Sequence, residues 1–305
     1  MSARNRTIAT EFILLGFSSD LRVNICLFIL FLAIYVATII GNGLIILVIL
    51  MNPRLHIPMY FFLCILSFMD LCTSTAVVPK LLADLFSAQR SISLGACALQ
   101  FYTVFLVSGT ESLLLALMAY DRYVAICRPL HYPVLMSWKT CHCLTALMWI
   151  VSFGILIIPS LSMSLELCYP NHINHFMCEA LAIMQLACDD IFGNTVLMLL
   201  TCFIGLFLPF LFVIASYGCI ISSILKIPSK SRLKAFSTCT SHITVVVLAY
   251  GSALLLYFGP SSQYSTKHGK YSSVFSYIIC PSINPLIYTL NNKDVKSTMR
   301  RPKKN

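Results

Sequence analysis

The amino-acid sequence predicts an all-α membrane protein, folded as a bundle of seven transmembrane helices. Of the 305 residues, 58% are hydrophobic and only 10% are charged, whereas a soluble domain carries roughly 25% charged residues. The mean hydropathy is +0.85. The apolar residues also gather in runs of about 20, the length that crosses a bilayer as a helix. A single large soluble domain is therefore excluded.

Seven apolar runs follow one another along the chain, and each is expected to form one helix. They occupy residues 25–50, 59–82, 98–120, 143–160, 195–225, 243–258 and 271–290. Strands of a membrane barrel would alternate apolar and polar residues, and these runs do not. The sixth and seventh runs are the most polar. The predicted organisation is an N-terminal segment of residues 1–24, a helical domain of residues 25–290 and a tail of residues 291–305.

Positive charges predict the orientation, because Lys and Arg concentrate on the cytoplasmic side of a membrane protein. If the N-terminus is outside, most of the 21 basic residues fall inside: Arg54, Arg122, Arg128, Lys139, Lys226, Lys230, Arg232, Lys234, Lys293, Lys296, Arg300, Arg301, Lys303 and Lys304. We therefore expect an extracellular N-terminus and a cytoplasmic tail that contains a short helix. The net charge of +10 then marks the inner surface, which attracts acidic lipids, and predicts no nucleic-acid partner.

Two further features agree with this orientation. Asn5 begins the triplet Asn-Arg-Thr, an N-glycosylation signal that is used only outside the cell. Of the 14 cysteines, four lie in the predicted outer segments: Cys97, Cys168, Cys178 and Cys188. Four cysteines on the oxidising side permit two disulfides, with three possible connectivities.

Two carboxylates, Asp70 and Glu111, fall inside predicted spans, where charges are costly and often functional. Neither has a basic neighbour at helical spacing in its own span. Together with Asn284 and Ser67 they offer the oxygen ligands that suit a hard cation such as sodium. A neutral hydrogen-bonded cluster that joins the helices is the alternative.

Prolines recur in the spans or at their ends. They are Pro58, Pro79, Pro159, Pro209, Pro281 and Pro285. Proline kinks a helix and frees a carbonyl group, which favours a bundle that contains a cavity and moves. Local distortion of the helices is the alternative.

Asp121 and Arg122 stand at the inner end of the third run. Adjacent opposite charges at this depth are expected to pair. Such a pair can act as a latch that frees the inner end of the helix when it opens. Alternatively, both charges simply mark the edge of the membrane.

The motifs of this chain resemble the rhodopsin-like G-protein-coupled receptors and, within them, the tetrapod-type (class II) odorant receptors. The similar segments are GN at 41–42, LHIPMYFFLCILSFMDLC at 55–72, MAYDRYVAICRPLHYP at 118–133, SY at 216–217, KAFSTCTSHITVV at 234–246 and PSINPLIYTLNNKDVK at 281–296. The second, third and fifth of these are specific to odorant receptors. The resemblance covers the chain almost from end to end.

The resemblance implies a receptor and not an enzyme. It implies a multi-pass protein of the plasma membrane, expected in the cilia of olfactory neurons, which binds a small volatile odorant. Binding would activate a heterotrimeric stimulatory G protein and raise cyclic AMP. A non-olfactory receptor for a small lipid or metabolite is the alternative. A light-driven pump is excluded, because residues 271–290 lack the lysine that would hold retinal.

The same resemblance assigns roles to matching positions. An activation switch would comprise Asp121, Arg122, Tyr123, Tyr217, Asn284, Pro285 and Tyr288. Asp70 and Glu111 match the family's allosteric sodium positions. Cys97–Cys178 and Cys168–Cys188 would be the disulfides. Tyr250 stands where most other receptors carry a tryptophan.

Family geometry places the ligand in the outer half of the bundle. The residues expected there are Val104, Phe105, Ser108, Gly109, Thr201, Cys202, Gly205, Tyr250, Ala253, Leu254, Tyr257, Val274 and Tyr277. This set carries no charge, so we expect a small, mostly hydrophobic neutral ligand with one oxygen function. A separate metal site at His175, Cys178 and Glu179 would compete with the disulfide for Cys178.

Overall fold

The structure is a computed structural model that describes residues 11–162, 171–187, 191–226, 229–258 and 266–291. Four predictions lie outside these residues. They concern glycosylation at Asn5, the Cys168–Cys188 disulfide, most of the C-terminal tail, and the short helix within that tail.

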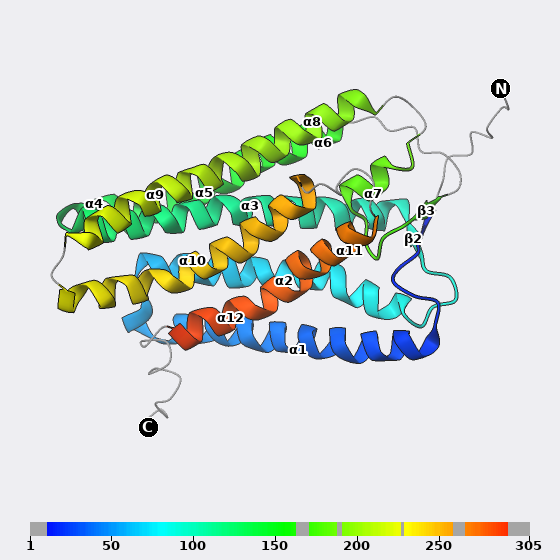
Figure 1. Cartoon of the computed structure of the whole chain (residues 1–305), viewed down its shortest axis with the longest axis horizontal. Coiled ribbons are helices and arrows are strands. Elements are labelled where there is room, and N and C mark those ends of the chain that lie inside the picture. The colour runs from blue at the N-terminus through cyan, green and yellow to red at the C-terminus, as the bar shows by residue number, and fades with distance from the viewer. Residues whose placement is uncertain (1–10, 163–170, 188–190, 227–228, 259–265, 292–305) are drawn as a thin grey trace.

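The described chain forms seven helical crossings, arranged side by side as a bundle (Figure 1). The first three are α1 (Leu21–Met51), α2 (Pro58–Asp84) and α3 (Leu94–Cys127). After the short α4 (Tyr132–Leu135), the fourth comprises α5 (Trp138–Ser152) and α6 (Ile158–Ser162). The fifth comprises α8 (Phe192–Cys202) and α9 (Leu208–Leu225), and the sixth is α10 (Ser229–Phe258). The seventh comprises α11 (Thr266–Val274) and α12 (Cys280–Asn291).

Six of these crossings are long and apolar enough to span a membrane on their own. The seventh begins with the polar sequence TKHGKYSSV in α11, in line with the polar character expected of the last run. The predicted seven-helix bundle is confirmed. The predicted helices were too short at their ends, because hydropathy detects only the part of a helix that lies within the bilayer core. For example, α3 begins at Leu94 and not at residue 98. The side chain of Ser93 caps this start by accepting a hydrogen bond from the Ala96 N–H.

Three crossings are interrupted by π-helical turns, at Phe153–Ile157, Phe203–Phe207 and Phe275–Ile279. Each turn ends two residues before a proline: Pro159, Pro209 or Pro281. A proline has no N–H to donate, and its ring clashes with the carbonyl group four residues earlier. That carbonyl belongs to the middle residue of each π turn, and the wider turn relieves the clash. The prolines therefore act on these helices as expected.

A small sheet, absent from the prediction, lies at one end of the bundle (Figure 1). Its central strand, β1 (Glu11–Leu14), pairs antiparallel with β2 (Ser91–Ser93) and parallel with β3 (His172–Ile173). Strands this short give no detectable alternation in the sequence. This end of the bundle is called the sheet end below.

Two basic side chains hold the segment after β1 onto the bundle. Arg90 donates hydrogen bonds to the carbonyls of Leu15 (2.8 Å) and Ser18 (2.7 Å). Lys270, in α11, donates to the Gly16 carbonyl (2.6 Å). Gly16 has a φ of 62°, a left-handed conformation that favours glycine. A Cβ atom here would also lie 3.0 Å from Arg90 Nη1.

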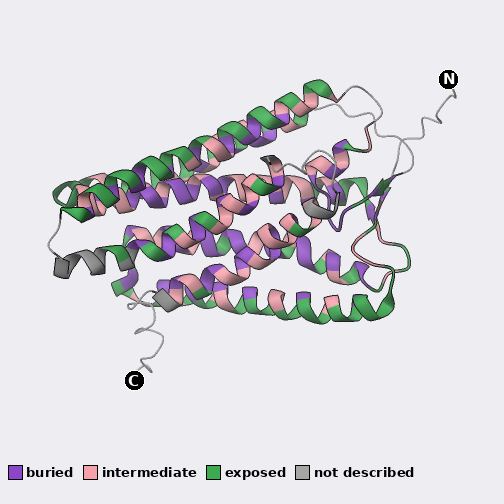
Figure 2. Ribbon diagram, in the orientation of Figure 1, coloured by how far each residue is buried: buried purple, intermediate pink, exposed green. Residues whose placement is uncertain are grey.

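Burial follows the pattern of a membrane protein, with the outward faces of the helices exposed and the interior buried (Figure 2). The exposed faces carry large apolar residues, such as Leu99 at 70% and Ile150 at 69% exposure. Polar side chains such as Asp70, Thr110 and Asn284 are buried instead. The apolar exterior fits a lipid environment, in which the interior holds the polar groups that contact other helices.

Candidate functional site

A cavity lies inside the bundle and is lined by the third to seventh crossings. The cavity volume is about 90 Å³. A cavity that holds one water molecule needs roughly 10–15 Å³. The lining residues are Phe105, Ser108, Gly109, Glu111, Ser112, Leu115, Leu156, Thr201, Cys202, Gly205, Leu206, Ala249, Tyr250, Ser252, Ala253, Leu256, Tyr257, Ser276, Tyr277 and Cys280. We call it the inner chamber. It is large enough for a small organic molecule.

All but three of the residues expected around a ligand line the inner chamber. The exceptions are Val104, Leu254 and Val274. Val104 is 3% exposed and packs in an apolar cluster with Phe176, and Val274 packs against the same cluster. Neighbouring residues on a helix point about 100° apart, so Val104 faces away from the chamber that Phe105 borders.

The π-helical turns supply several lining residues that the sequence did not suggest. Leu156 comes from the turn in the fourth crossing, Leu206 from the turn in the fifth and Ser276 from the turn in the seventh. A π turn displaces the residues that follow it relative to an ideal helix, and such turns are frequent at functional sites. The regular placement of Pro159, Pro209 and Pro281 was the available signal.

Glu111 also lines the inner chamber, which corrects the expectation that no charge would lie there. It follows the predicted Ser108 by almost one helical turn, so both side chains share a face of α3. The side chain is only partly buried, because it borders the cavity. Its carboxylate interacts electrostatically with Asp70 and Cys280.

Leu156 fits into a notch between two glycines at the wall of the inner chamber. A Cβ atom on Gly109 of α3 would lie 2.2 Å from Leu156 Cδ1. One on Gly205, in the fifth crossing, would lie 3.1 Å from Leu156 Cδ2. The two glycines thus let a leucine of the fourth crossing reach the chamber.

Tyr250 joins α10 to α3 beneath the chamber. Its hydroxyl donates a 2.6 Å hydrogen bond to the Ser112 carbonyl, and its ring lies 5.1 Å from that of Phe210. Only 1% of the residue is exposed. A ligand in the chamber would therefore contact a side chain that connects three crossings.

Asp70 and Asn284 meet in the interior, as their sequence positions suggested. The Asn284 amide donates to both carboxylate oxygens of Asp70, at 3.2 and 3.1 Å. One turn further along α2, the buried hydroxyls of Thr73 and Ser74 have no hydrogen-bond partner among the described residues. This oxygen-rich set, with Glu111 nearby, fits a hard cation, and the Asn284 bonds equally suit a neutral polar cluster.

At the end of the bundle opposite the sheet, Asp121 does not form the expected ion pair with Arg122. Its carboxylate accepts a 2.8 Å hydrogen bond from the Tyr132 hydroxyl in α4, and no direct Asp121–Arg122 bridge occurs in the described part of the chain. The two charges still interact electrostatically. Adjacent residues point in different directions on a helix, which separates the two charged groups.

Two of the other switch residues, Tyr217 of the fifth crossing and Tyr288 of the seventh, lie near Arg122, as does His242 of the sixth. Asn284 instead contacts Asp70, and Pro285 lies against Gly41. Tyr123 points elsewhere and its ring lies 6.4 Å from that of Tyr120.

His242 connects three helices through hydrogen bonds that were not predicted from the sequence. Its Nδ1 is 2.7 Å from the Tyr217 hydroxyl, and its Nε2 is 3.2 Å from the Leu115 carbonyl. The chain of contacts joins α9, α10 and α3. A histidine inside an apolar run, as in the segment SHITVV, was the available signal.

Pro285 and Asn42 connect the seventh crossing to the first. A Cβ atom on Gly41 would lie 3.0 Å from Pro285 Cβ. The neighbouring Asn42 amide donates to the Pro281 carbonyl (2.9 Å). The GN pair in α1 therefore permits a close approach to α12.

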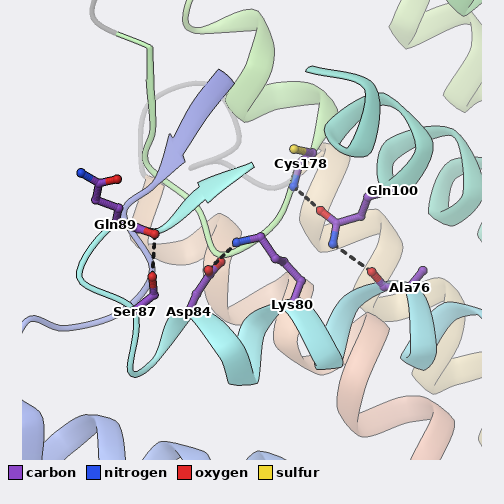
Figure 3. Close-up of polar contacts among 7 residues, drawn as sticks. All are labelled: Ala76, Lys80, Asp84, Ser87, Gln89, Gln100 and Cys178. Atoms are coloured by element: carbon purple, nitrogen blue, oxygen red, sulfur yellow. Dashed lines mark hydrogen bonds and ion pairs between the residues drawn. The ribbon is translucent and has the colours of Figure 1, made fainter. Parts of the chain in front are cut away.

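The loop that follows the fourth crossing is fixed at the sheet end by the Cys97–Cys178 disulfide, as predicted. Gln100 supports this link (Figure 3): it accepts from the Cys178 N–H (2.9 Å) and donates to the Ala76 carbonyl (2.9 Å). Figure 3 also shows Lys80 beside Asp84 in α2. The disulfide occupies Cys178, so the suggested metal site with His175 and Glu179 loses its thiolate.

Glu179 and His175 are buried in this loop. Burial raises the pKa of Glu179 to about 7, although N–H groups at the start of α7 (Ala180–Met184) oppose the shift. Burial lowers the pKa of His175 to about 3, and Lys270 adds to this effect. Both groups therefore favour their neutral forms.

Comparisons with known proteins agree with these features. The model of the olfactory receptor family matches residues 31–303. Human olfactory receptor 2C3 is 45% identical over 302 residues, which cover 98% of this chain and 94% of that receptor. Mouse olfactory receptor 5AR1 is 43% identical over 303 residues, which cover 99% and 98% respectively.

The chain belongs to the olfactory receptor family. It is therefore a receptor and not an enzyme, and a multi-pass protein of the plasma membrane. Membership implies odorant ligands and coupling to G proteins in general. The inner chamber and the residues around Arg122 are accordingly the candidate ligand site and the candidate switch of this olfactory receptor.

Proposed function

We propose that this receptor binds a small, mostly hydrophobic neutral odorant in the inner chamber and activates a stimulatory G protein, which raises cyclic AMP. One observation supports this proposal above the others. The cavity is lined by five crossings, and the helices that line it also carry the connections around Arg122. A ligand that shifts the lining helices would therefore change those connections.

The lining supports a ligand with few polar atoms. Apolar residues such as Phe105, Leu156 and Leu206 alternate with hydroxyl groups such as those of Ser108 and Tyr257. Apolar walls with a few polar groups are typical of small-molecule sites. One oxygen function on the ligand would satisfy those hydroxyls.

The orientation proposed from the sequence has the sheet end outside the cell. The Cys97–Cys178 disulfide at that end favours the oxidising side of the membrane. Glycosylation of Asn5 would test the orientation: glycosidase treatment should increase the gel mobility of the receptor but leave an Asn5→Gln variant unchanged.

The opposite end would then face the G protein. Arg122 is the residue that would turn toward the partner on activation, with Tyr217, Asn284, Pro285 and Tyr288 as further parts of the switch. Basic residues of the inner segments would attract acidic lipids as well. A sodium ion held by Asp70 and Glu111 is proposed as an allosteric cation.

A cyclic AMP reporter in transfected cells, screened with a broad panel of odorants, tests the proposed function. We expect at least one neutral odorant to raise cyclic AMP. Ser108→Val and Tyr257→Phe should weaken the response to that odorant, because each removes a hydroxyl from the chamber. Absence of any response, despite surface expression verified by antibody labelling, would contradict the proposal.

A further inference from the structure

A second cavity lies between the inner chamber and the sheet end. Its cavity volume is about 170 Å³, compared with about 90 Å³ for the inner chamber. The walls come from α3, from α6 and α8, and from the short helix α7, and Phe12 of β1 closes it. We call it the outer chamber.

The two chambers are adjacent, because Phe105 and Thr201 line both of them. The Thr201 hydroxyl donates to the Leu197 carbonyl within its own helix (2.8 Å), so it presents little free polarity to either chamber. The Phe105 ring stacks on Phe101 at 5.4 Å. Phe105 therefore lies at the boundary between the two spaces.

The chambers differ in chemistry. The outer chamber is mostly apolar, with Phe101, Ile183, Met184 and Met198 in its walls, although Tyr102, Ser160 and Thr201 also line it. Methionine side chains adapt to ligands of varied shape. The inner chamber instead carries Glu111 and several hydroxyl groups. One end of the combined space is therefore polar and the other is apolar.

We propose that the two chambers form one elongated site for a linear alcohol, whose hydroxyl group binds beside Glu111 and whose hydrocarbon tail passes Phe105 into the outer chamber. This inference rests on the proposed function and adds to it the chemical class of the ligand.

The hydroxyl group at one end of the proposed ligand, its head group, is inferred from the surroundings of Glu111. No hydrogen bond to the Glu111 carboxylate is found among the described residues, and its side chain is accessible from the chamber. A carboxyl group keeps an accepting oxygen in either protonation state. An alcohol can donate to that oxygen and accept from Ser108. An acid would add a second carboxyl group, and an ammonium ion would lose more hydration than a hydroxyl.

The tail follows from the apolar walls. Each methylene group that enters the outer chamber should tighten binding roughly fourfold. Binding should therefore strengthen along a series of straight-chain primary alcohols until the outer chamber is full. Short alcohols that reach only the inner chamber should bind weakly.

The test measures how much each alcohol of the series raises the unfolding temperature of the purified full-length receptor. Cyclic AMP responses to the same alcohols are measured in cells. Ala98→Leu and Ala180→Leu each reduce the outer chamber only, since neither residue lines the inner one. Ala96→Leu is the matched control, because Ala96 is exposed and borders a different groove between α2 and α3.

We expect the two chamber variants to bind long alcohols about tenfold or more weakly than the wild type, as for the loss of about two methylene contacts. Their binding of short alcohols should change little. The Ala96→Leu control should bind both short and long alcohols as the wild type does. Equal effects on short and long alcohols, or none, would overturn the proposal. So would an absence of alcohol binding to a folded receptor that responds to other odorants. Alcohol binding without a cyclic AMP response would contradict the proposed coupling only.

Glu111→Gln tests the head group by comparison of ligands of one chain length. The wild type should bind the alcohol more tightly than the methyl ether of the same alcohol, which lacks the donor. The substitution replaces the carboxyl group by an amide, whose NH2 group can donate to the ether oxygen, and should therefore reduce this preference severalfold. A wild-type receptor that binds ether and alcohol equally would overturn the assignment of Glu111, as would tighter binding of the matching amine.

Discussion

Arg122 lies near side chains of three other crossings at the end of the bundle opposite the sheet. Its neighbours Tyr217, His242 and Tyr288 come from three different crossings, while Asp121 is held by Tyr132. The arginine is therefore not locked by its adjacent carboxylate. It is placed to exchange partners when the helices move.

The first prediction concerns this arginine. Arg122→Ala should abolish odorant-induced cyclic AMP and leave the receptor at the cell surface, because the change removes the charge but no apolar packing of the core. Reporter assays with surface labelling measure both quantities. Arg54→Ala is the control, since Arg54 is an exposed arginine of the predicted inner segments that lies outside the switch. Normal signalling by Arg122→Ala would refute its role in the switch.

His242 is a second residue whose loss should be measurable. His242→Phe removes both contacts and leaves the buried Tyr217 hydroxyl without its histidine partner, which costs about 1–3 kcal/mol of unfolding free energy. The Leu115 carbonyl keeps its hydrogen bond within α3. Thermal unfolding of the purified receptor should show the loss. Tyr217→Phe removes only one of the two bonds, so its effect should be smaller. Equal stability of His242→Phe and wild type would rule out a stabilising role.

Glu179 gives the receptor a pH-dependent stability. Its pKa is about 7 in the folded chain, compared with an ordinary value of 4.5. Between these values the folded state retains a proton that the unfolded state releases. The contribution of Glu179 is thus fully present below about pH 4.5 and is lost as the pH rises through about 7.

Glu179→Gln should remove this dependence. Relative to the variant, the wild type should lose up to about 3 kcal/mol as the pH rises from 5 to 8. Thermal unfolding of both proteins across this range measures the difference. His175, whose pKa is lowered to about 3, changes stability in the opposite direction but is common to both proteins. A difference that does not vary with pH would contradict the burial of an uncompensated carboxyl group.

At the scale of elements, the π-helical turns decide which residues face the inner chamber. The turns in the fourth and fifth crossings bring Leu156 and Gly205 together, and the turn in the seventh contributes Ser276 and Tyr277. Each turn is imposed by a proline two residues further on. The prolines thus shape the cavity without lining it.

The contact between the third and fourth crossings yields a further prediction. Gly109→Ala places a methyl group against Leu156 Cδ1, so the leucine side chain must shift toward the inner chamber that it borders. The overpacking should cost about 1–3 kcal/mol. Leu156→Ala in the same protein should restore part of this loss. Gly218→Ala is the control, since its Cβ would meet open space and should be neutral or slightly stabilising.

At the scale of the whole molecule, the sheet end is held by covalent and polar links between segments far apart in the sequence. The Cys97–Cys178 disulfide joins α3 to the loop before α7, and β1 pairs with both β2 and β3. Arg90 and Lys270 fix the chain that follows β1. These links hold Phe12 and Cys97 in place, which line the outer chamber, so this end covers that chamber.

Removal of the disulfide should loosen that cover. Replacement of both Cys97 and Cys178 by Ala should lower the unfolding free energy by about 2–5 kcal/mol and reduce the fraction of receptor at the surface. Thermal unfolding and surface labelling measure these effects. Cys143→Ala, at an exposed free cysteine, is the control. A double variant as stable as the control would show that the sheet and the Gln100 contacts suffice.

The seven helical crossings could be predicted from the sequence, because a bilayer requires long apolar segments. The motifs of the sequence also indicated the family and the Cys97–Cys178 disulfide. Ten of the 20 residues that line the inner chamber were expected from the family resemblance, among them Ser108, Gly109 and Tyr250, whereas Glu111 was not.

The side chains that meet across helices could be identified only in the folded bundle. It placed Glu111 in the chamber, directed Val104 away from it, and joined Tyr217 to His242 and Asp121 to Tyr132. Such contacts depend on how far each helix is rotated and where a π turn shifts its register. Rotation and register arise from packing between distant segments, and a pattern of hydropathy along one segment does not contain them.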